Sequence, residues 1–219
     1  MYIIQFCTIL GIYITSDYIL RQRYNGVYYL IHFLNNIAVT YYSLPALIYS
    51  YTNIIKYHEY PLDYTSSILT AALHIYHIIS YYNKLRFDDY LHHGLMVFIV
   101  LPLGIYLNSG SLLDHAYFYL TGPPGGINYL LLFLTRNGYI ERITQKKLNN
   151  YINLWFRCPG CISHVVLSVI AFLHNKEIFS SFDVYLFLII NILIFWNGIY
   201  YMNQVVANYN IVINSYHKQ

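Results

Sequence analysis

Charged residues are scarce in this chain of 219 residues. Asp, Glu, Lys and Arg together make up 10% of it, whereas soluble domains carry about 25%. Hydrophobic residues reach 58% and the mean hydropathy is +0.42, which excludes an ordinary water-soluble globule and is typical of a polytopic membrane protein. The formal net charge of +3 is small, and the basic residues are scattered between apolar runs, so we expect no nucleic-acid partner.

Cysteine is also rare, and the marks of an extracellular face are missing. Cys7, Cys158 and Cys161 cannot build a disulfide framework, and the sequence contains no Asn-x-Ser/Thr glycosylation signal. The first twenty residues are apolar but lack a basic start and a small-residue cleavage site, so we interpret them as a retained membrane span. Without a repeat of fixed period or a low-complexity linker, the sequence predicts a single transmembrane domain over residues 1–219.

Long apolar runs predict an all-α, polytopic bundle of about seven transmembrane helices. A helix needs about 20 mostly apolar residues to cross about 30 Å of hydrocarbon. Such windows lie near residues 2–20, 24–50, 64–82, 90–107, 115–135, 156–174 and 183–202. The longest polar connector, 136–155, has the pattern of a helix that lies along the membrane surface, although a plain cytosolic loop fits it equally well.

The basic residues sort to one side of this arrangement. The connectors of one face hold ten of the twelve: Arg21, Arg23, Lys84, Arg86, Arg136, Arg142, Lys146, Lys147, Arg157 and Lys218. The opposite face holds only Lys56 and Lys176. Because cytoplasmic loops carry an excess of Lys and Arg, we predict that the N-terminus lies outside and the C-terminus in the cytosol. Short spans with tyrosines near their ends favour the endoplasmic reticulum or another internal membrane over the plasma membrane.

The third window carries a polar stripe. At about 100° per residue, eight side chains fall within an arc of about 100°: Asp63, Ser66, Ser67, Thr70, His74, His77, Tyr81 and Lys84. Polar and ionisable groups inside a bilayer normally face the bundle interior, so we expect the stripe to face protein or water. It is either a set of hydrogen bonds between helices or part of a lipid-binding site that includes Thr70, His74 and His77.

The fourth window opens with an acid and two histidines. Asp89, His92, His93 and Met96 are spaced i, i+3, i+4 and i+7, which places them on one helical face. A carboxylate can fix the tautomer of one imidazole, whose other nitrogen then acts as a general base or nucleophile. We therefore predict a site at the cytosolic edge of the bundle with Asp89, His92 and His93 as catalytic candidates. A structural role is the alternative.

The fifth window is interrupted by the Gly-Pro-Pro-Gly-Gly segment at 122–126. Proline removes backbone donors and glycine loosens a helix, so we do not expect this segment to continue as a regular helix. Freed backbone groups at that depth are tolerated where they are buried in protein or line a wet cavity. We expect the break to lie against the His-bearing helices, with Thr121, Pro124 and Asn128 beside a bound lipid. A kink that packs another helix closely is the alternative.

The spacing of possible metal ligands argues against a metal centre. Integral-membrane desaturases and hydroxylases carry HxxxH and HxxHH boxes, whose imidazoles hold iron. Here His74-x-x-His77 is one residue short, and the His92-His93 pair has no histidine three residues before it. The single CxxC at 158–161 is a weak zinc or thiol signal without a second pair. We therefore predict no metal site and no bound cofactor.

The arrangement resembles a known family. A polar helix is followed by Asp89-x-x-His92-His93 at the opening of a span, and a Pro-bearing segment that contains Asn128 comes one span later. This order resembles the TLC domain shared by translocation-associated membrane proteins and ceramide synthases, over about residues 20–205. Ceramide synthases transfer an acyl group from acyl-CoA to a sphingoid amine, near the cytosolic side of a helix-lined lipid cavity. The resemblance implies that role for His92 and His93.

After the histidine pair, the chain differs from the ceramide synthases. No Thr follows at the expected place in 94–97, and the nearest approach to their HD-x-x-D run is Asp114-His115, on the other face. Shorter TLC-domain proteins without that signature are associated with membrane lipid composition. The resemblance thus implies lipid sensing, transport or composition control, with a membrane lipid or acyl chain as partner. An acyltransferase with acyl-CoA as substrate is the alternative, and a metal-dependent lipid oxidase is the third.

Overall fold

The computed structural model describes residues 2–85, 87–107 and 109–216, without the side chains of residues 88, 89 and 91. Helices make up 88% of the structure, and the described residues form no strand. The prediction of an all-α protein is therefore confirmed.

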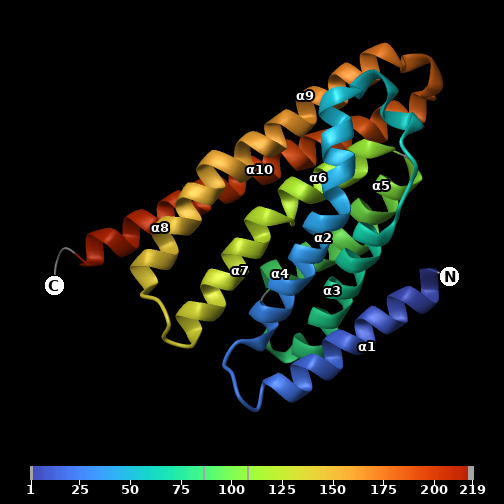
Figure 1. Ribbon diagram of the computed structural model, residues 1–219. Helices are drawn as coiled ribbons and strands as arrows, with labels where there is room; N and C mark the ends of the chain where they lie inside the picture. Colours follow the sequence, from blue (N-terminus) through green and yellow to red (C-terminus); the bar gives the residue numbers. More distant parts are fainter. Residues whose placement is uncertain (1, 86, 108, 217–219) are drawn as a thin grey trace.

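The helices follow one another along the chain with short connections (Figure 1). The α-helices are α1 Tyr2–Leu20, α2 Val27–Thr52, α3 Thr65–Tyr81, α4 Phe87–Leu95, α5 Leu101–Tyr106, α6 Ser111–Leu120, α7 Pro123–Arg136, α8 Arg142–Ile152, α9 Cys158–His174 and α10 Ser181–Tyr216. The 3-10 helices between them are η1 Ile54–Glu59, η2 Tyr82–Lys84 and η5 Lys176–Ile178. Two π-helical turns, η3 Met96–Val100 and η4 Asn153–Arg157, join α4 to α5 and α8 to α9.

Side-chain caps set where two of these helices begin. At α10, the Ser180 hydroxyl donates to Asp183 Oδ2 at 2.7 Å, and the Asp183 backbone N–H donates to Ser180 Oγ at 3.2 Å. At α3, the Thr65 backbone N–H donates to Asp63 Oδ1 at 2.9 Å. The bonds from the Asp183 and Thr65 N–H groups satisfy backbone donors that have no partner inside the helix, so the local sequence favours both starts.

The helices run to and fro between two ends of the bundle (Figure 1). At one end, the turn before α2 meets the turn after α7. There the Asn25 backbone N–H donates to Asn137 Oδ1 at 3.0 Å, and Asn137 Nδ2 donates to the Asn25 carbonyl at 2.9 Å. At the other end, Asn175 Nδ2 donates to the Ile55 carbonyl in η1 at 2.9 Å. Each end is therefore held by bonds between connectors that are distant in sequence.

Helix α2 lies at the centre and contacts α1, α3, α6 and α7. One apolar cluster around it consists of Val39, Leu69, Leu101 and Tyr117. The same helix also buries two amides, and Asn35 Nδ2 donates to Asn36 Oδ1 at 3.1 Å. Because buried polar groups need hydrogen-bond partners, the two amides partly satisfy each other inside the bundle.

A proline follows each π-helical turn, Pro102 after η3 and Pro159 after η4. A proline ring clashes with the carbonyl four residues earlier and donates no hydrogen bond. In η3 the Leu101 N–H bonds to the Met96 carbonyl, five residues back, and η4 closes with the same kind of bond. The widened turn lets each helical pass continue where a regular helix would kink or break.

Two helices extend beyond the predicted membrane-span windows. The polar connector 136–155 is helical from Arg142 and continues through η4 into α9, so it is neither a plain loop nor a separate helix. The last helix runs to Tyr216 and not to 202, a length of about 54 Å at 1.5 Å per residue. In both places polar residues extend a helix built from apolar ones, and hydropathy windows do not register such extensions.

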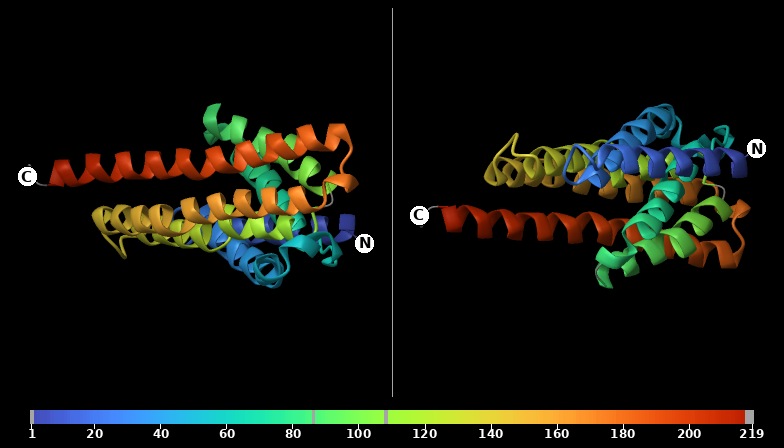
Figure 2. Two further views of the ribbon diagram at one scale, coloured as in Figure 1. Left: turned by 90° about the horizontal axis from the view of Figure 1, so that it is seen from above. Right: turned by 90° about the horizontal axis from the view of Figure 1, so that it is seen from below.

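The length and apolar composition of several helices indicate a membrane-embedded protein. In the described part of the chain, three are long and apolar enough to cross a membrane: Tyr2–Leu20, Arg142–His174 and Ser181–Tyr216. Figure 2 shows α10 extending along one side of the bundle to the C-terminus. Large apolar side chains such as Ile3 and Leu173 are 79% and 63% exposed, a surface that suits lipid and not water. The count of seven crossings and the orientation stay predictions.

A buried carboxylate holds α1 against the bundle. Asp17 is 0% exposed, forms an ion pair with Arg21 and accepts a hydrogen bond from Tyr81 Oη at 2.8 Å. One turn earlier, Tyr13 Oη donates to Asn35 Oδ1 of α2 at 2.6 Å. These polar contacts attach an otherwise largely exposed helix to α2 and α3.

We expect Asp17→Asn to lower the free energy of unfolding by about 1 to 3 kcal/mol. The amide keeps the shape of the carboxylate but loses its charge, while the half-exposed Arg21 side chain remains hydrated. Thermal unfolding in detergent measures the loss. The exposed Glu141→Gln is the matched control, and an equal loss in that variant would contradict the anchoring role of Asp17.

Candidate functional site

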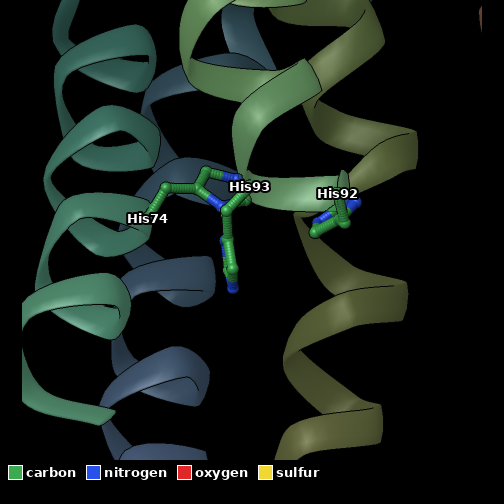
Figure 3. A group of neighbouring side chains, drawn as sticks. All are labelled: His74, His92 and His93. Carbon is green, nitrogen blue, oxygen red and sulfur yellow. Dashed lines mark hydrogen bonds between the residues drawn. The ribbon is translucent and has the colours of Figure 1, made fainter. Parts of the chain in front are cut away.

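Three histidines from two helices converge inside the bundle (Figure 3). His74 comes from α3, and His92 and His93 come from α4. His74 Nδ1 lies 2.6 Å from His93 Nδ1, and one ring nitrogen of each residue lies within 4.8 Å of the others. We call His74, His92 and His93 the histidine cluster. The structure thus brings together side chains that the sequence placed on two separate helical faces.

The histidine cluster is sheltered and still reachable. His74 and His93 are 8% and 4% exposed, whereas His92 is partly exposed. His74 lies seven residues before the end of α3 at Tyr81, about 10 Å along a helix axis. The cluster therefore lies near the end of the bundle where α3 stops and α4 begins, with His92 on its accessible side.

A second layer of rings surrounds the cluster. The centroid of the His77 ring lies 4.6 Å from that of His93 and 5.3 Å from that of Tyr28, on which it stacks. The His32 ring lies 5.3 Å from His77 and 4.4 Å from Tyr129 of α7. Helices α2, α3, α4 and α7 thus contribute aromatic side chains to one region.

Sequence reasoning missed His32. An ionisable residue in the otherwise apolar window 24–50 was the available signal. The residue lies on α2, and helical periodicity relates only residues of the same helix. Its Nδ1 lies 2.7 Å from the Tyr28 carbonyl oxygen of the same helix, but its approach to His77 depends on how α2 packs on α3.

The middle of the polar stripe faces the protein, whereas its two ends, Asp63 and Lys84, are exposed. Ser66, Ser67, Thr70 and His74 are all buried. The Thr70 hydroxyl donates to the Ser66 carbonyl at 2.8 Å within its own helix, so its proton is already bonded. Thr121, which the sequence placed beside a lipid, ends α6 and donates to the Tyr117 carbonyl at 2.9 Å. Both threonines therefore satisfy backbone carbonyls.

The prediction that no regular helix runs through the Gly-Pro-Pro-Gly-Gly segment is confirmed, although most of the segment lies inside the next helix. Helix α6 ends at Leu120 and α7 begins at Pro123, so the interruption falls at Thr121 and Gly122. Pro123 and Pro124 occupy the first turn of α7. A missing N–H does no harm there, because the first turn has no partner for it.

This first turn of α7 packs on α2, which corrects the expected packing against the helices of His74 and His92. A Cβ at Gly125 would lie 2.7 Å from Asn36 Nδ2. Pro124 is fully buried. Asn128 Oδ1 is buried without a hydrogen-bond partner among the described residues. The segment approaches the histidine cluster through α2, by the contact of Tyr129 with His32.

Three predicted residues cannot be placed at the site. Asp89 belongs to α4, but its side chain lies outside the described residues. Arg86 and Lys218, which enter the charge sorting, also lie outside them. The role of Asp89 beside the histidine pair therefore stays a prediction.

An apolar groove of about 330 Å³ lies between α1, α3 and α5. Its walls include Phe6, Ile68, Ala71 and Leu101. Ala71 and His74 are one turn apart on the same face of α3, so the α3 wall of the groove ends about 5 Å from His74 along the helix axis. Sequence reasoning missed the groove, since its apolar residues look like any lipid-facing ones.

A second buried pair lies between α6 and α9. His115 Nδ1 is 3.2 Å from His164 Nδ1, and Ser168 Oγ is 3.2 Å from His164 Nε2. A cavity of about 50 Å³ touches His164 and Ser168, enough room for a few water molecules. The cysteines of the CxxC are free thiols buried in α9, and Cys161 packs against Gly198 of α10.

Comparison of the chain with protein-family models, with curated proteins and with solved structures finds no match. The resemblance to the TLC domain therefore stays a prediction. Function has to be argued from the geometry of the histidine cluster and the groove.

Proposed function

We propose that this chain is an integral membrane protein that holds a membrane lipid or its acyl chain in the groove between α1, α3 and α5. The polar head of the lipid would lie at the histidine cluster. The role is lipid sensing, transport or control of membrane composition. One observation carries the proposal: Ala71 in the groove wall and His74 in the cluster share one face of α3. An apolar groove that leads to a few polar groups suits an amphipathic ligand.

The proposal includes seven membrane crossings with a cytosolic C-terminus, and the charge difference between the two ends of the bundle supports it. The end at which Asn25 meets Asn137 carries Arg21, Arg23, Arg136 and Arg142. The end at which Asn175 meets Ile55 carries Lys56 and Lys176. Under the positive-inside rule the first end faces the cytosol. The histidine cluster would then lie in the cytosolic half.

The TLC-like arrangement over 20–205 belongs to the same proposal, as one domain in the endoplasmic reticulum or another internal membrane. The proximity of His74, from the polar helix, to His92 and His93 supports it. So does the packing of the Pro-bearing α7 on α2, whose His32 borders the cluster.

An acyltransferase is the second candidate, favoured by the partial exposure of His92. Its imidazole nitrogen would attack the thioester carbonyl of acyl-CoA, and the CoA thiolate would leave and take up a proton. The acyl group would then pass to an amine, which would lose a proton and restore the imidazole. This candidate predicts an acyl adduct on the purified protein that is absent from His92→Ala, as mass spectrometry can show.

Filling the groove should expel the lipid. We expect Ala71→Phe to retain about tenfold less lipid than wild type, since overpacking costs about 1 to 3 kcal/mol and 1.4 kcal/mol is tenfold. Native mass spectrometry of the purified protein measures bound lipid. Ile79→Phe, on the same helix but 54% exposed, is the matched control and should retain the wild-type amount. Equal retention by all three proteins would refute the groove assignment.

A further inference from the structure

The histidine cluster contains the donor set of a transition-metal site. One ring nitrogen each from His74, His92 and His93 lies within 4.8 Å of the others, and Figure 3 shows His74 and His93 meeting between α3 and α4, with His92 beside them on α4. We propose that the histidine cluster binds one zinc ion. The inference goes beyond the proposed lipid function and does not depend on it.

The observed distances are close to those that zinc requires. Zinc–imidazole bonds are about 2.0 to 2.1 Å long, so two nitrogens on a tetrahedral ion lie about 3.3 Å apart. In the cluster, His74 Nδ1 and His93 Nδ1 lie 2.6 Å apart, and one nitrogen of each of the three rings lies within 4.8 Å of the others. The three side chains would adjust toward the zinc geometry when the ion binds.

A plain hydrogen bond between two histidines is the alternative to a bound ion, and it involves only two of the three rings. Between two neutral imidazoles, one Nδ1–H can donate to the other Nδ1, and this accounts for the 2.6 Å contact between His74 and His93. The ring centroid of His92 lies 5.3 Å from that of His74, so a shared ion would use all three rings.

The type of donor selects the ion. Imidazole nitrogen suits zinc, iron, nickel and copper, whereas magnesium and calcium require oxygen ligands. Three histidines with an open fourth position are the ligand set of one class of catalytic zinc site. Because His92 is partly exposed, the fourth position would be reached from its side. Three neutral ligands leave the charge of the ion uncompensated, so hydroxide or a carboxylate would suit that position.

The zinc site departs from the sequence expectation of no metal. That expectation compared ligand spacings with the HxxxH and HxxHH boxes. His74 and His92 are eighteen residues apart and belong to different helices, so no spacing rule for one helix applies to them. The π-helical turn η3 begins three residues after His93, and π turns occur frequently at functional sites.

The test is zinc binding by the full chain in detergent. The purified protein is stripped with a chelator, dialysed against buffered Zn²⁺ and analysed for zinc and protein. We expect about one zinc per chain, with nitrogen neighbours at about 2.0 to 2.1 Å in X-ray absorption. Wild-type protein that retains no zinc, or zinc bound without nitrogen neighbours, would overturn the proposal.

Variants of the two buried histidine pairs provide the controls. His74→Ala and His93→Ala should weaken zinc binding at least about 10- to 100-fold. Substitution of residues that only hydrogen-bond to metal ligands already causes losses of that size. His115→Ala and His164→Ala should bind zinc like wild type, because that pair is also buried with close nitrogens, but among the described residues it is not part of a group of three possible metal ligands. Equal losses in both sets would refute the assignment. His93→Gln, which better preserves side-chain volume, repeats the test if an alanine variant does not fold.

Bound lipid is measured in the same preparations, so that the two proposals can fail separately. Zinc without lipid would overturn the groove assignment and support the zinc site. Lipid without zinc would overturn the zinc site and support the groove.

Discussion

Gly110→Ala is expected to lower the free energy of unfolding by about 2 to 5 kcal/mol. Gly110 precedes α6 with φ 50° and ψ −131°, a conformation that residues with a Cβ rarely adopt. A Cβ there would lie 2.1 Å from the Tyr57 carbonyl oxygen and 3.0 Å from His58 Cα. These are backbone atoms, so no side-chain rotation can relieve the clash.

The substitution would push η1 away from the start of α6. Tyr57 is buried and packs with Leu112 and Ala171 in one apolar cluster, so several elements would lose contact together. Burial raises the pKa of Tyr57 to about 12, so the phenol in this contact stays uncharged even in mildly alkaline solution. Thermal unfolding in detergent should show the destabilisation as a lower midpoint.

Alanine variants at two further glycines distinguish the effect of backbone strain from the effect of the clash. Gly138 has φ 78° but nothing within 4 Å of an added Cβ, so Gly138→Ala should cost about 1 kcal/mol from strain alone. Gly11 lies inside α1 with open space around it, so Gly11→Ala should be neutral or stabilising by up to about 1 kcal/mol. If Gly110→Ala lowered the free energy of unfolding no more than Gly138→Ala, η1 would be able to move away from the added Cβ without measurable destabilisation, and the clash would be excluded as a cause.

Gly160→Ala is expected to cost about 1 to 3 kcal/mol through a clash with one ring. A Cβ at Gly160 of α9 would lie 1.9 Å from Tyr119 Cδ1 of α6, so the glycine allows the two helices to approach closely. If the ring turned away, Tyr119 Oη would lose its 3.1 Å contact with Tyr51 Oη. Either the ring gives up that contact or the helices separate.

A Tyr119→Ala background tests this cause. With the ring removed, the cost of Gly160→Ala should fall to near zero, and the double-mutant cycle should give an interaction energy of about 1 to 3 kcal/mol. Unfolding of the wild type, both single variants and the double variant in one detergent provides the four values. An equal cost with and without the Tyr119 ring would exclude the clash.

The candidate site was predictable as far as single helices determine it. Helical periodicity aligned His74 with the buried stripe of α3 and placed His92 and His93 together on α4, because side-chain directions within one helix follow from its geometry. It could not find His32 or the groove. His32 meets His77 only through the rotation of α2 against α3, and Phe6, Ala71 and Leu101 form a groove only when three helices pack with a gap between them.

The helical, membrane-embedded character of the chain followed from amino-acid order alone. Long runs without charge favour burial in lipid, where a backbone must satisfy its own hydrogen bonds as a helix. Three features, by contrast, depended on the tertiary structure. Helix α8 continues into α9, two prolines begin α7, and three imidazoles lie within 4.8 Å of one another. The physical reason is that distances between helices depend on contacts among residues far apart in the chain, and a pattern along one segment does not contain them.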